Sequence, residues 1–184
     1  MKQLRGVVMC GGQSRRMGTD KGLIPIQNTC WAKFIADKLA ALSLPVSVSI
    51  NQTQQRAYLS FFDSGELIID SFDIGGPLNG LLSVHEQFPH DDLLLLACDM
   101  ISMESETLQA LIIIYQNDEQ LHHFYTYQNG AFAEPLCAIY TATGLAKSKS
   151  SSGNDTSLQK VLREGITKYI PLSNPQSFKN YNTL

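Results

Sequence analysis

The sequence predicts an α/β protein, a single domain over residues 1–184 with a mostly parallel sheet and helices on both of its faces. Three observations support this prediction. Short apolar runs alternate with helical patterns along the whole chain. Hydrophobic residues make up 43% of the 184 and charged residues 17%, which is typical of globular domains. We see neither an internal repeat nor a linker, and the length suits one domain of roughly 100–200 residues.

The first half of the chain begins with a short apolar strand over 6–10, followed by a loop that contains glycines. Apolar residues at helical spacing predict a helix over about 31–42. Residues 45–50 alternate as a strand, 54–62 indicate a helix, and 66–69 form a strand that ends at Asp70. Gly76-Pro77 opens a helix to about residue 88, because proline suits the first helical turn.

The second half continues the alternation. The apolar run 92–98 predicts a strand that is buried on both faces and ends at Asp99. A helix over 105–115 is followed by strands over 122–127 and 135–140, a loop over 148–155, a helix over 156–163 and a strand near 169–172. Parallel sheets bind ligands at the carboxyl ends of their strands. The glycine loop, Asp70 and Asp99 are therefore expected to meet there.

The distribution of charge favours a phosphate ligand. The net charge of −3 lacks the basic character of a nucleic-acid binder. Residues 1–38 nevertheless hold seven of the 14 basic residues, whereas 57–146 contain thirteen acids and no Lys or Arg. Most of these acids are expected to be solvated, the Asp91-Asp92 turn among them. A polyphosphate would use the basic segment, and a divalent metal bridging to it would use one or two of the central acids.

Other functional classes are excluded by what the sequence lacks. No apolar run approaches the ~20 residues that span a bilayer, and no secretory signal precedes the first strand, so we expect a cytoplasmic protein without a membrane partner. The four cysteines are widely spaced and do not read as a zinc site. His122 and His123 have no partner ligands at metal spacing, which favours a surface or edge role.

The glycine loop, residues 9–21, reads Met-Cys-Gly-Gly-Gln-Ser-Arg-Arg-Met-Gly-Thr-Asp-Lys. Adjacent glycines let the backbone turn and bring its N–H groups close to phosphate oxygens, and Arg15, Arg16 and Lys21 add positive charge. A Walker A loop is excluded, because Gly18 is not followed directly by Lys. A dinucleotide fingerprint is excluded as well, because it requires Gly-x-Gly-x-x-Gly.

This segment resembles the opening of the MobA-like nucleotidyltransferases, which build molybdenum dinucleotide cofactors and typically carry Leu-Ala-Gly-Gly-x-Ser-x-Arg-Met-Gly-x-Asp-Lys. The resemblance covers nearly the whole chain and implies a Rossmann-like fold of the nucleotide-diphospho-sugar transferase type. The matching residues are Gly11-Gly12, Ser14, Arg16-Met17-Gly18, Asp20-Lys21, Ile69-Asp70, Gly76-Pro77-Leu78-Asn79-Gly80, Cys98-Asp99-Met100, Glu134-Pro135-Leu136 and Asn180-Tyr181-Asn182-Thr183.

The resemblance implies a Mg²⁺-dependent guanylyltransferase that moves GMP from GTP to the terminal phosphate of molybdopterin and releases pyrophosphate. Gly11-Gly12 favours GTP, because the cytidylyltransferases of the family carry Ala-Gly at these positions. The implied partners are GTP, molybdopterin, carrier proteins of the molybdenum cofactor and the molybdoenzymes that accept the product. Neither nucleic acid nor a membrane is expected.

The resemblance also assigns residues to roles. Lys21 is expected at the α-phosphate, Arg16 at the phosphates or the departing pyrophosphate, and Asp99 at Mg²⁺. The nucleotide is expected to contact the backbone of the loop, including the N–H groups of residues 10–12, and two further polar side chains. This nucleotide set is Met9, Cys10, Gly11, Gly12, Lys21, Asn51, Asp70 and Asp99, and Asn180 and Asn182 correspond to the pterin-binding residues.

Several alternatives remain open at this point. Asp99 could cap a helix, Asp70 could be a turn residue, and Asn180 and Asn182 could be the polar end of a frayed terminus. Ile101 stands where the family commonly has proline. The alternative functions are a cytidylyltransferase or another nucleotidyltransferase with a different phosphorylated acceptor, and a module that binds GTP or pterin without catalysing transfer.

Overall fold

The computed structural model describes residues 3–11, 20–119, 122–148, 156–172 and 175–178. Within these ranges a seven-stranded sheet has the order β5-β4-β1-β6-β8-β7-β9. All neighbouring strands are parallel except β8, which runs antiparallel to β6 and to β7. The strands are β1 Leu4–Met9, β4 Val46–Ile50, β5 Leu67–Ile69, β6 Asp92–Ala97, β7 Phe124–Asn129, β8 Phe132–Tyr140 and β9 Thr167–Pro171. The predicted mostly parallel sheet is confirmed.

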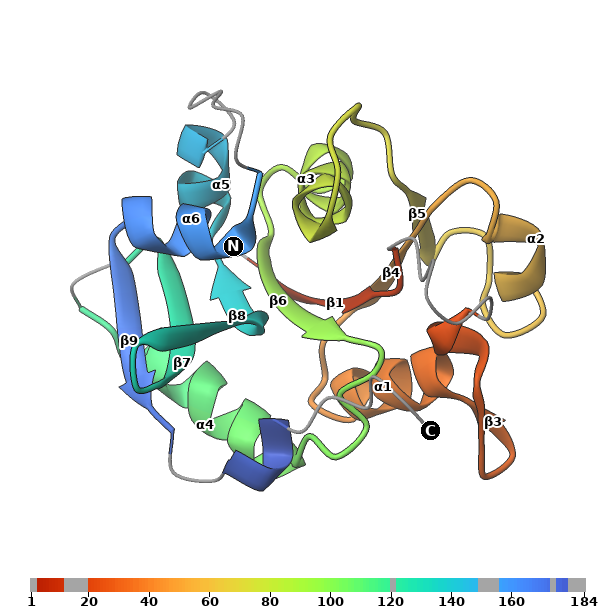
Figure 1. The fold of residues 1–184 in the computed structure, drawn as a ribbon, viewed down its shortest axis with the longest axis horizontal. Coiled ribbons are helices and arrows are strands. Elements are labelled where there is room, and N and C mark those ends of the chain that lie inside the picture. Colours follow the sequence, from red (N-terminus) through yellow and green to blue (C-terminus); the bar gives the residue numbers. More distant parts are fainter. Residues whose placement is uncertain (1–2, 12–19, 120–121, 149–155, 173–174, 179–184) are drawn as a thin grey trace.

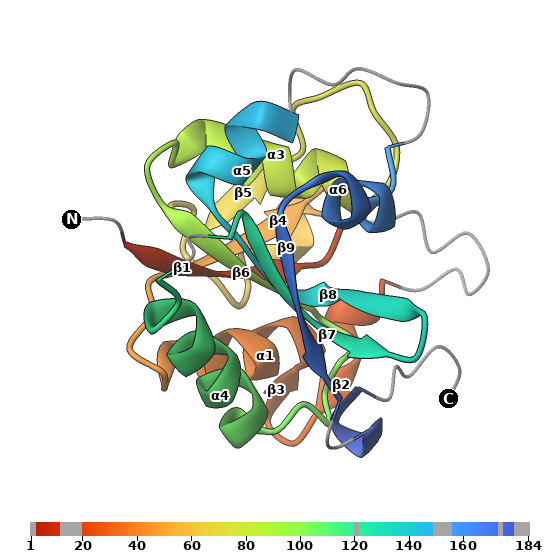
Figure 2. The same ribbon diagram turned by 90° about the vertical axis from the view of Figure 1, so that its left-hand side faces the viewer.

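Helices cover both faces of this sheet, as predicted (Figures 1 and 2). The helices α1 (Trp31–Ala40) and α4 (Ser105–Gln116) pack on one face, together with the short α2 (Gln55–Tyr58) beside the edge at β5. The helices α3 (Pro77–Gln87), α5 (Ala142–Ser148) and α6 (Leu158–Glu164) pack on the other face. Each face has its own hydrophobic core, and α3 starts at the predicted Gly76-Pro77.

The central strand β6 separates the two cores. Leu94 and Leu96 face α1 and α4, and Leu93 and Leu95 face the core under α3 and α5, all four without exposed surface. This alternation explains why the run is continuously apolar, since both faces of the strand are covered by helices. The prediction of a strand buried on both faces is confirmed, and Asp99, two residues after its end, lies at the carboxyl edge of the sheet.

The structure differs from the predicted elements in three places. The helix expected over 54–62 is only Gln55–Tyr58, and the chain continues as turns in which Leu59 and Phe61 are exposed and Phe62 is buried against Tyr58. A small hairpin of β2 (Pro25–Ile26) and β3 (Thr29–Cys30) precedes α1, and each strand is too short to produce a periodic pattern. Helix α5 follows β8 directly, where no helix was expected.

Strand β1 is the point at which the order of the strands reverses. From β1 the chain passes through α1 to β4 on one side, and later through α3 to β6 on the other. Such a switch point opens a crevice at the carboxyl ends of the strands. No helix in the described ranges is long and apolar enough to cross a membrane, and all four cysteines are buried with free thiols.

Candidate functional site

Lys21 and Asp99 form an ion pair at the carboxyl edge of the sheet. Lys21 opens a 3-10 turn (Lys21–Leu23), and Asp99 follows the end of β6. The Nζ atom of Lys21 lies 3.0 Å from Oδ2 of Asp99, and the two side chains keep 22% and 13% of their surface exposed. The pair joins positions 78 residues apart in the chain. It brings the cationic N-terminal segment against one of the central acids.

Asp70 stands at the same edge, at the end of β5. Its Oδ1 accepts a hydrogen bond of 3.1 Å from the hydroxyl of Ser49, and burial raises its pKa. A Cβ atom added at Gly11 would lie 3.0 Å from Oδ2 of Asp70, and one added at Gly80 would lie 2.1 Å from Oγ of Ser49. The two glycines therefore allow the end of β1 and helix α3 to approach this carboxylate closely.

The loop after Asp70 is held by Asn79 in the first turn of α3. The Nδ2 group of Asn79 donates to the carbonyl oxygens of Phe72 (2.6 Å) and Ile74 (3.1 Å), and its Oδ1 accepts from the N–H of Phe72. Together with Gly80, Asn79 explains why these residue types occur in the Gly-Pro-Leu-Asn-Gly string. The proline starts the helix, the asparagine fixes the loop, and the second glycine makes room for Ser49 and Asp70.

Two predicted backbone donors are used differently from what we expected. The N–H groups of Cys10 and Gly11 both donate to the carbonyl oxygen of Ser49, at 3.0 and 3.1 Å, because the loop follows β4 for two residues beyond the end of β1. The expectation that these two groups offer donors to phosphate is therefore corrected. Met9 and Cys10 are buried at the carboxyl end of β1.

Asn51 lies directly after β4, at the predicted edge, and it caps the turn that begins α2. Its Oδ1 accepts from the N–H and the hydroxyl of Thr53, at 3.0 and 2.6 Å, and from the N–H of Gln54 at 3.2 Å. The other predicted site residues Gly12, Arg16, Asn180 and Asn182 lie outside the described residues.

Four residues near the Lys21–Asp99 pair were given no role by the sequence, although one of them, Asp20, belongs to the motif. Asp20 accepts hydrogen bonds from Gln54 (2.7 Å) and from the hydroxyl of Tyr58 (3.0 Å). Lys38 of α1, whose pKa is lowered by burial, donates to the carbonyl oxygens of Ile101 and Met103. It therefore fixes the loop after Asp99, where the family commonly has a proline. The motif pointed to Asp20, whereas no signal pointed to Gln54, Tyr58 or Lys38.

The opposite edge of the sheet also holds buried acids. Asp92 was expected to be solvated, but its side chain is enclosed. It accepts from the hydroxyl of Tyr115 (2.6 Å) and from the N–H of Ala142 (2.7 Å), because helices α4 and α5 cover this position. Nearby, Asp118 binds His122 and Lys168 at 2.6 and 2.8 Å. A cavity of about 510 Å³ adjoins both acids.

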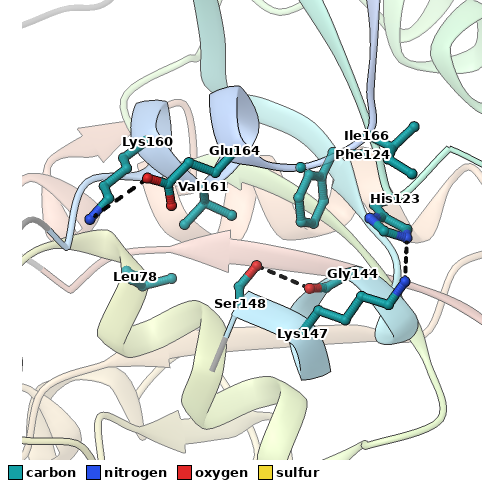
Figure 3. Close-up of a pocket in the computed structure, with 11 residues that line it drawn as sticks. Leu78, His123, Phe124, Gly144, Lys147, Ser148, Lys160, Val161, Glu164 and Ile166 are labelled. Atoms are coloured by element: carbon teal, nitrogen blue, oxygen red, sulfur yellow. Dashed lines mark hydrogen bonds and ion pairs between the residues drawn. The ribbon is translucent and has the colours of Figure 1, made fainter. Parts of the chain in front are cut away.

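A smaller cavity of about 170 Å³ lies between α5 and α6 (Figure 3). Leu78, Phe124 and Val161 form its apolar wall. Lys147 at its rim lies 3.1 Å from Nε2 of His123, and burial, followed by the charge of this lysine, lowers the pKa of that histidine. Neither Lys21, Asp70 nor Asp99 lines either cavity.

Among the described residues, the edge at Lys21 and Asp99 has separate carboxylates and no cluster of metal-binding side chains. Nowhere in these ranges do three His, Cys, Asp or Glu side chains gather closely enough to hold a metal ion. Mg²⁺ commonly takes only one or two carboxylates and completes its shell with phosphate oxygens and water. The partly buried carboxylate of Asp99 fits that role, because it would supply one oxygen ligand to the cation and leave the other positions to phosphate and water.

Comparisons with known proteins point to one family. A family model described as the MobA-like NTP transferase domain matches residues 6–169. A molybdenum cofactor guanylyltransferase of Campylobacter jejuni (strain RM1221) is 26% identical over 186 residues, which cover 99% of this chain and 92% of that protein. A molybdenum cofactor biosynthesis bifunctional protein of Synechocystis is 31% identical over 142 residues, which cover 77% of this chain but only 40% of that longer protein.

Solved structures share the fold. The molybdopterin-guanine dinucleotide biosynthesis protein A of Archaeoglobus fulgidus superposes with a TM-score of 0.78 at 19% identity, covering 97% of this chain and 92% of that one. The bifunctional IspDF of Campylobacter jejuni superposes with a TM-score of 0.74 at 11% identity, covering 98% of this chain and 52% of that one. At these identities the likeness concerns the fold alone.

Proposed function

The chain belongs to the MobA-like NTP transferase family, and we propose that it is a molybdenum cofactor guanylyltransferase. In the proposed reaction the terminal phosphate of molybdopterin attacks the α-phosphorus of GTP. A new P–O–P bond forms, the bond between the α- and β-phosphates breaks, and pyrophosphate leaves. The observation that carries the proposal is the 3.0 Å contact between Lys21 and Asp99 at the carboxyl edge of the sheet.

The chemistry asks the protein mainly for position and charge. The attacking phosphate is already an anion, so no side chain has to remove a proton from it, and catalysis depends on aligning two anions and neutralising their repulsion. We assign Lys21 to the α-phosphate, because its amine is held at the edge where the loop meets β6. Arg16 would contact the phosphates or the departing pyrophosphate.

Asp99 is the proposed ligand of Mg²⁺, which when bound would neutralise phosphate charge. The same carboxylate accepts a hydrogen bond from the amine of Lys21, which balances its charge. In the proposed complex the amine of Lys21 would donate to the α-phosphate, and the carboxylate of Asp99 would hold the cation.

GTP is the proposed donor on two grounds. Gly11-Gly12 is the form of the motif that the resemblance associates with GTP, and the relative that matches 99% of this chain is named a guanylyltransferase. We propose that the guanosine lies against Met9, Cys10, Gly11 and Gly12, with Asn51 and Asp70 as polar contacts. Molybdopterin would lie toward Asn180 and Asn182.

The proposal is tested by Mg²⁺-dependent pyrophosphate release from GTP and molybdopterin. Lys21→Ala and Asp99→Ala should each lower the rate by roughly 10²–10³-fold, the usual effect of removing one group that stabilises transition-state charge. The matched control is the exposed ion pair of Lys33 and Asp37 on α1, whose alanine variants should keep the rate of the wild type. Full activity of Lys21→Ala or Asp99→Ala would refute the assignment.

Competition between GTP, CTP and ATP in the same assay separates the alternatives. Preference for CTP, or transfer only to another phosphorylated acceptor, would move the protein to a different activity on the same site. Tight GTP binding without pyrophosphate release in the presence of molybdopterin would indicate a binding module.

A further inference from the structure

We propose that Tyr58 and Gln54 are positioning residues of the transfer reaction. They clamp Asp20 to the end of β1 and so hold the neighbouring Lys21 against Asp99. The catalytic consequence of this clamp rests on the proposed function, whereas its existence rests on contacts among described residues.

Asp20 is the centre of the clamp, because its carboxylate accepts three hydrogen bonds. Its Oδ1 accepts from the N–H of Gly22 and from the hydroxyl of Tyr58, both at 3.0 Å, and its Oδ2 accepts from Nε2 of Gln54 at 2.7 Å. Asp20 is the cap of the short turn that begins at Lys21. With both oxygens bound, neither the side chain nor the start of that turn can rotate freely.

Gln54 connects this cap to the end of β1. Its Nε2 also donates to the carbonyl oxygen of Cys10 at 3.2 Å, and its Oε1 accepts from the N–H of Asn51 at 2.8 Å. Cys10 and Asp20 flank the central part of the glycine loop in the sequence. One amide side chain therefore fixes the distance between the two ends of the loop, while the turn at Asn51 fixes the amide.

Tyr58 reaches Asp20 only because residue 22 is glycine. A Cβ atom at Gly22 would lie 2.0 Å from the hydroxyl oxygen of Tyr58 and 3.1 Å from its Cζ. Tyr58 has no exposed surface, and burial raises its pKa, so the hydroxyl remains a donor at any working pH. Phe62 stacks on the ring at 6.1 Å between centroids and holds it from the other side.

The clamp should affect the rate more than nucleotide binding. A cation that must meet charge developing at the α-phosphate is effective when it is already in place, because no reorganisation is then needed during the reaction. Freeing Asp20 allows Lys21 to adopt other positions, and only a fraction of the bound complexes then reacts. The expected signature is a lower kcat with little change in KM for GTP.

The first test compares Tyr58→Phe and Gln54→Ala with Tyr140→Phe. Tyr140 is also fully buried, and its hydroxyl donates to the carbonyl oxygen of Pro135 at 2.8 Å, so Tyr140→Phe removes a hydroxyl hydrogen bond of a buried tyrosine outside the clamp. We expect kcat to fall about tenfold in each clamp variant, with KM for GTP within about twofold, because hydrogen bonds to a charged group are among the stronger ones. Tyr140→Phe should keep the kcat of the wild type. A wild-type kcat in both clamp variants would overturn the proposal.

A second test asks whether Tyr58 acts through Lys21. In a Lys21→Ala background the amine is already missing, so adding Tyr58→Phe should lower the residual rate by less than about twofold. A further tenfold loss would show that the hydroxyl acts independently of Lys21 and would overturn the inference.

A third measurement keeps the clamp apart from the proposed function. Hydrogen exchange at the Gly22 amide, followed by NMR, should accelerate in Tyr58→Phe and Gln54→Ala and stay unchanged in Tyr140→Phe, because this amide donates to Asp20. If the wild type releases no pyrophosphate from GTP, the proposed function fails, and the exchange data still decide whether the clamp exists. Unchanged Gly22 exchange in both clamp variants overturns the clamp even if the enzyme is active.

Discussion

Asp118 is buried and Asp70 is partly buried, and the two acids lie at opposite edges of the sheet with opposite surroundings. Asp118, at the amino ends of the parallel strands, accepts hydrogen bonds from Lys168 (2.8 Å), from the His122 ring (2.6 Å) and from the Tyr125 hydroxyl (2.9 Å). Although burial alone would raise its pKa, these partners, Lys168 foremost, lower the pKa well below its usual range. Asp70, at the carboxyl ends, accepts from Ser49, and burial raises its pKa.

The contrast separates structural acids from candidate functional ones by the number of hydrogen-bond donors that each carboxylate has. A buried carboxylate that has several donors contributes to stability, whereas one that is desolvated with few donors costs stability and keeps its capacity for a ligand. Asp92 belongs to the first group, since the Tyr115 hydroxyl and the Ala142 N–H hold it. Asp70 is therefore expected to cost stability, whereas Asp118 and Asp92 contribute to it.

The largest effect on stability is expected at Asp118. Replacing it with alanine removes the acceptor of the partly exposed Lys168, of the His122 ring and of the Tyr125 hydroxyl, and a hydrogen bond to a charged group typically contributes about 1.5–3 kcal/mol. We therefore expect Asp118→Ala to lower the free energy of unfolding by about 3 kcal/mol, as measured by urea denaturation. Because this edge is remote from Lys21, kcat per folded molecule should stay at the value of the wild type. A tenfold drop in kcat would contradict this expectation and show that the two edges of the sheet are coupled.

Lowering the pH should remove the stabilisation that Asp118 contributes. The folded-state pKa of Asp118 is lowered, so the group stabilises the fold above its unfolded pKa of about 3.9, and the stabilisation is lost as the pH falls toward the folded value. Asp118→Asn lacks this titration. The gap in unfolding free energy between wild type and Asp118→Asn should therefore be full at pH 7 and shrink below about pH 4. A gap that does not change with pH would contradict the assignment.

An intermediate effect is expected at Gly80, on the carboxyl edge. An alanine Cβ there would lie 2.1 Å from Oγ of Ser49 and 3.1 Å from Oδ1 of Asp70, so these groups must move. Overpacking of this kind typically costs about 1–3 kcal/mol. We expect Gly80→Ala to lose about 2 kcal/mol of stability and to raise the Kd for GTP, measured by calorimetry.

Gly65→Ala is the matched control for this substitution. Nothing lies within 4 Å of a Cβ atom at Gly65, so the added methyl group should leave stability and GTP binding close to those of the wild type. If Gly80→Ala behaves like Gly65→Ala, the close packing around Asp70 does not govern the site.

Most of the fold and the centre of the site were predictable from the sequence, for identifiable reasons. The run before Asp99 is apolar at every position, which indicates a strand covered on both faces, and such a strand delivers the next residue to the carboxyl edge. Gly76-Pro77 marks the start of α3 in the same direct way. Local patterns of this kind do not depend on which segments later become neighbours.

The residues that sequence reasoning missed depend on contacts between distant segments. Tyr58 reads as one apolar position of a helix, and its hydroxyl gains a role only when Gly22 and Asp20 are folded against it. Asp92 follows another acid and a histidine, a pattern typical of a solvated turn, yet α4 and α5 close over it. The backbone groups of Cys10 and Gly11 were assigned to the ligand because their pairing with Ser49 is invisible without the strand order.

The smallest effect on stability is expected at Asp70. Whether its replacement raises or lowers stability is the sharpest test of the difference between Asp70 and Asp118. Its folded-state pKa is raised, so the ionised carboxylate destabilises the fold, and stability falls as the pH rises from the unfolded pKa of about 3.9 through the folded value. Asp70→Asn removes this charge while retaining a side chain of the same shape. We expect it to be about 1 kcal/mol more stable than the wild type at pH 7, the usual scale of a single stabilising substitution, and weaker in GTP binding.

The control for this prediction is Asp73→Asn, since Asp73 lies in the same loop but is exposed. Losing a solvated charge should leave stability within about 0.5 kcal/mol of the wild type. The advantage of Asp70→Asn should disappear below about pH 4, where the carboxyl group of the wild type is protonated in both states. An Asp70→Asn protein that is less stable than the wild type at pH 7 would place Asp70 with Asp118 among the structural acids. Lys21 and Asp99 would then be the remaining candidate functional residues of the carboxyl edge.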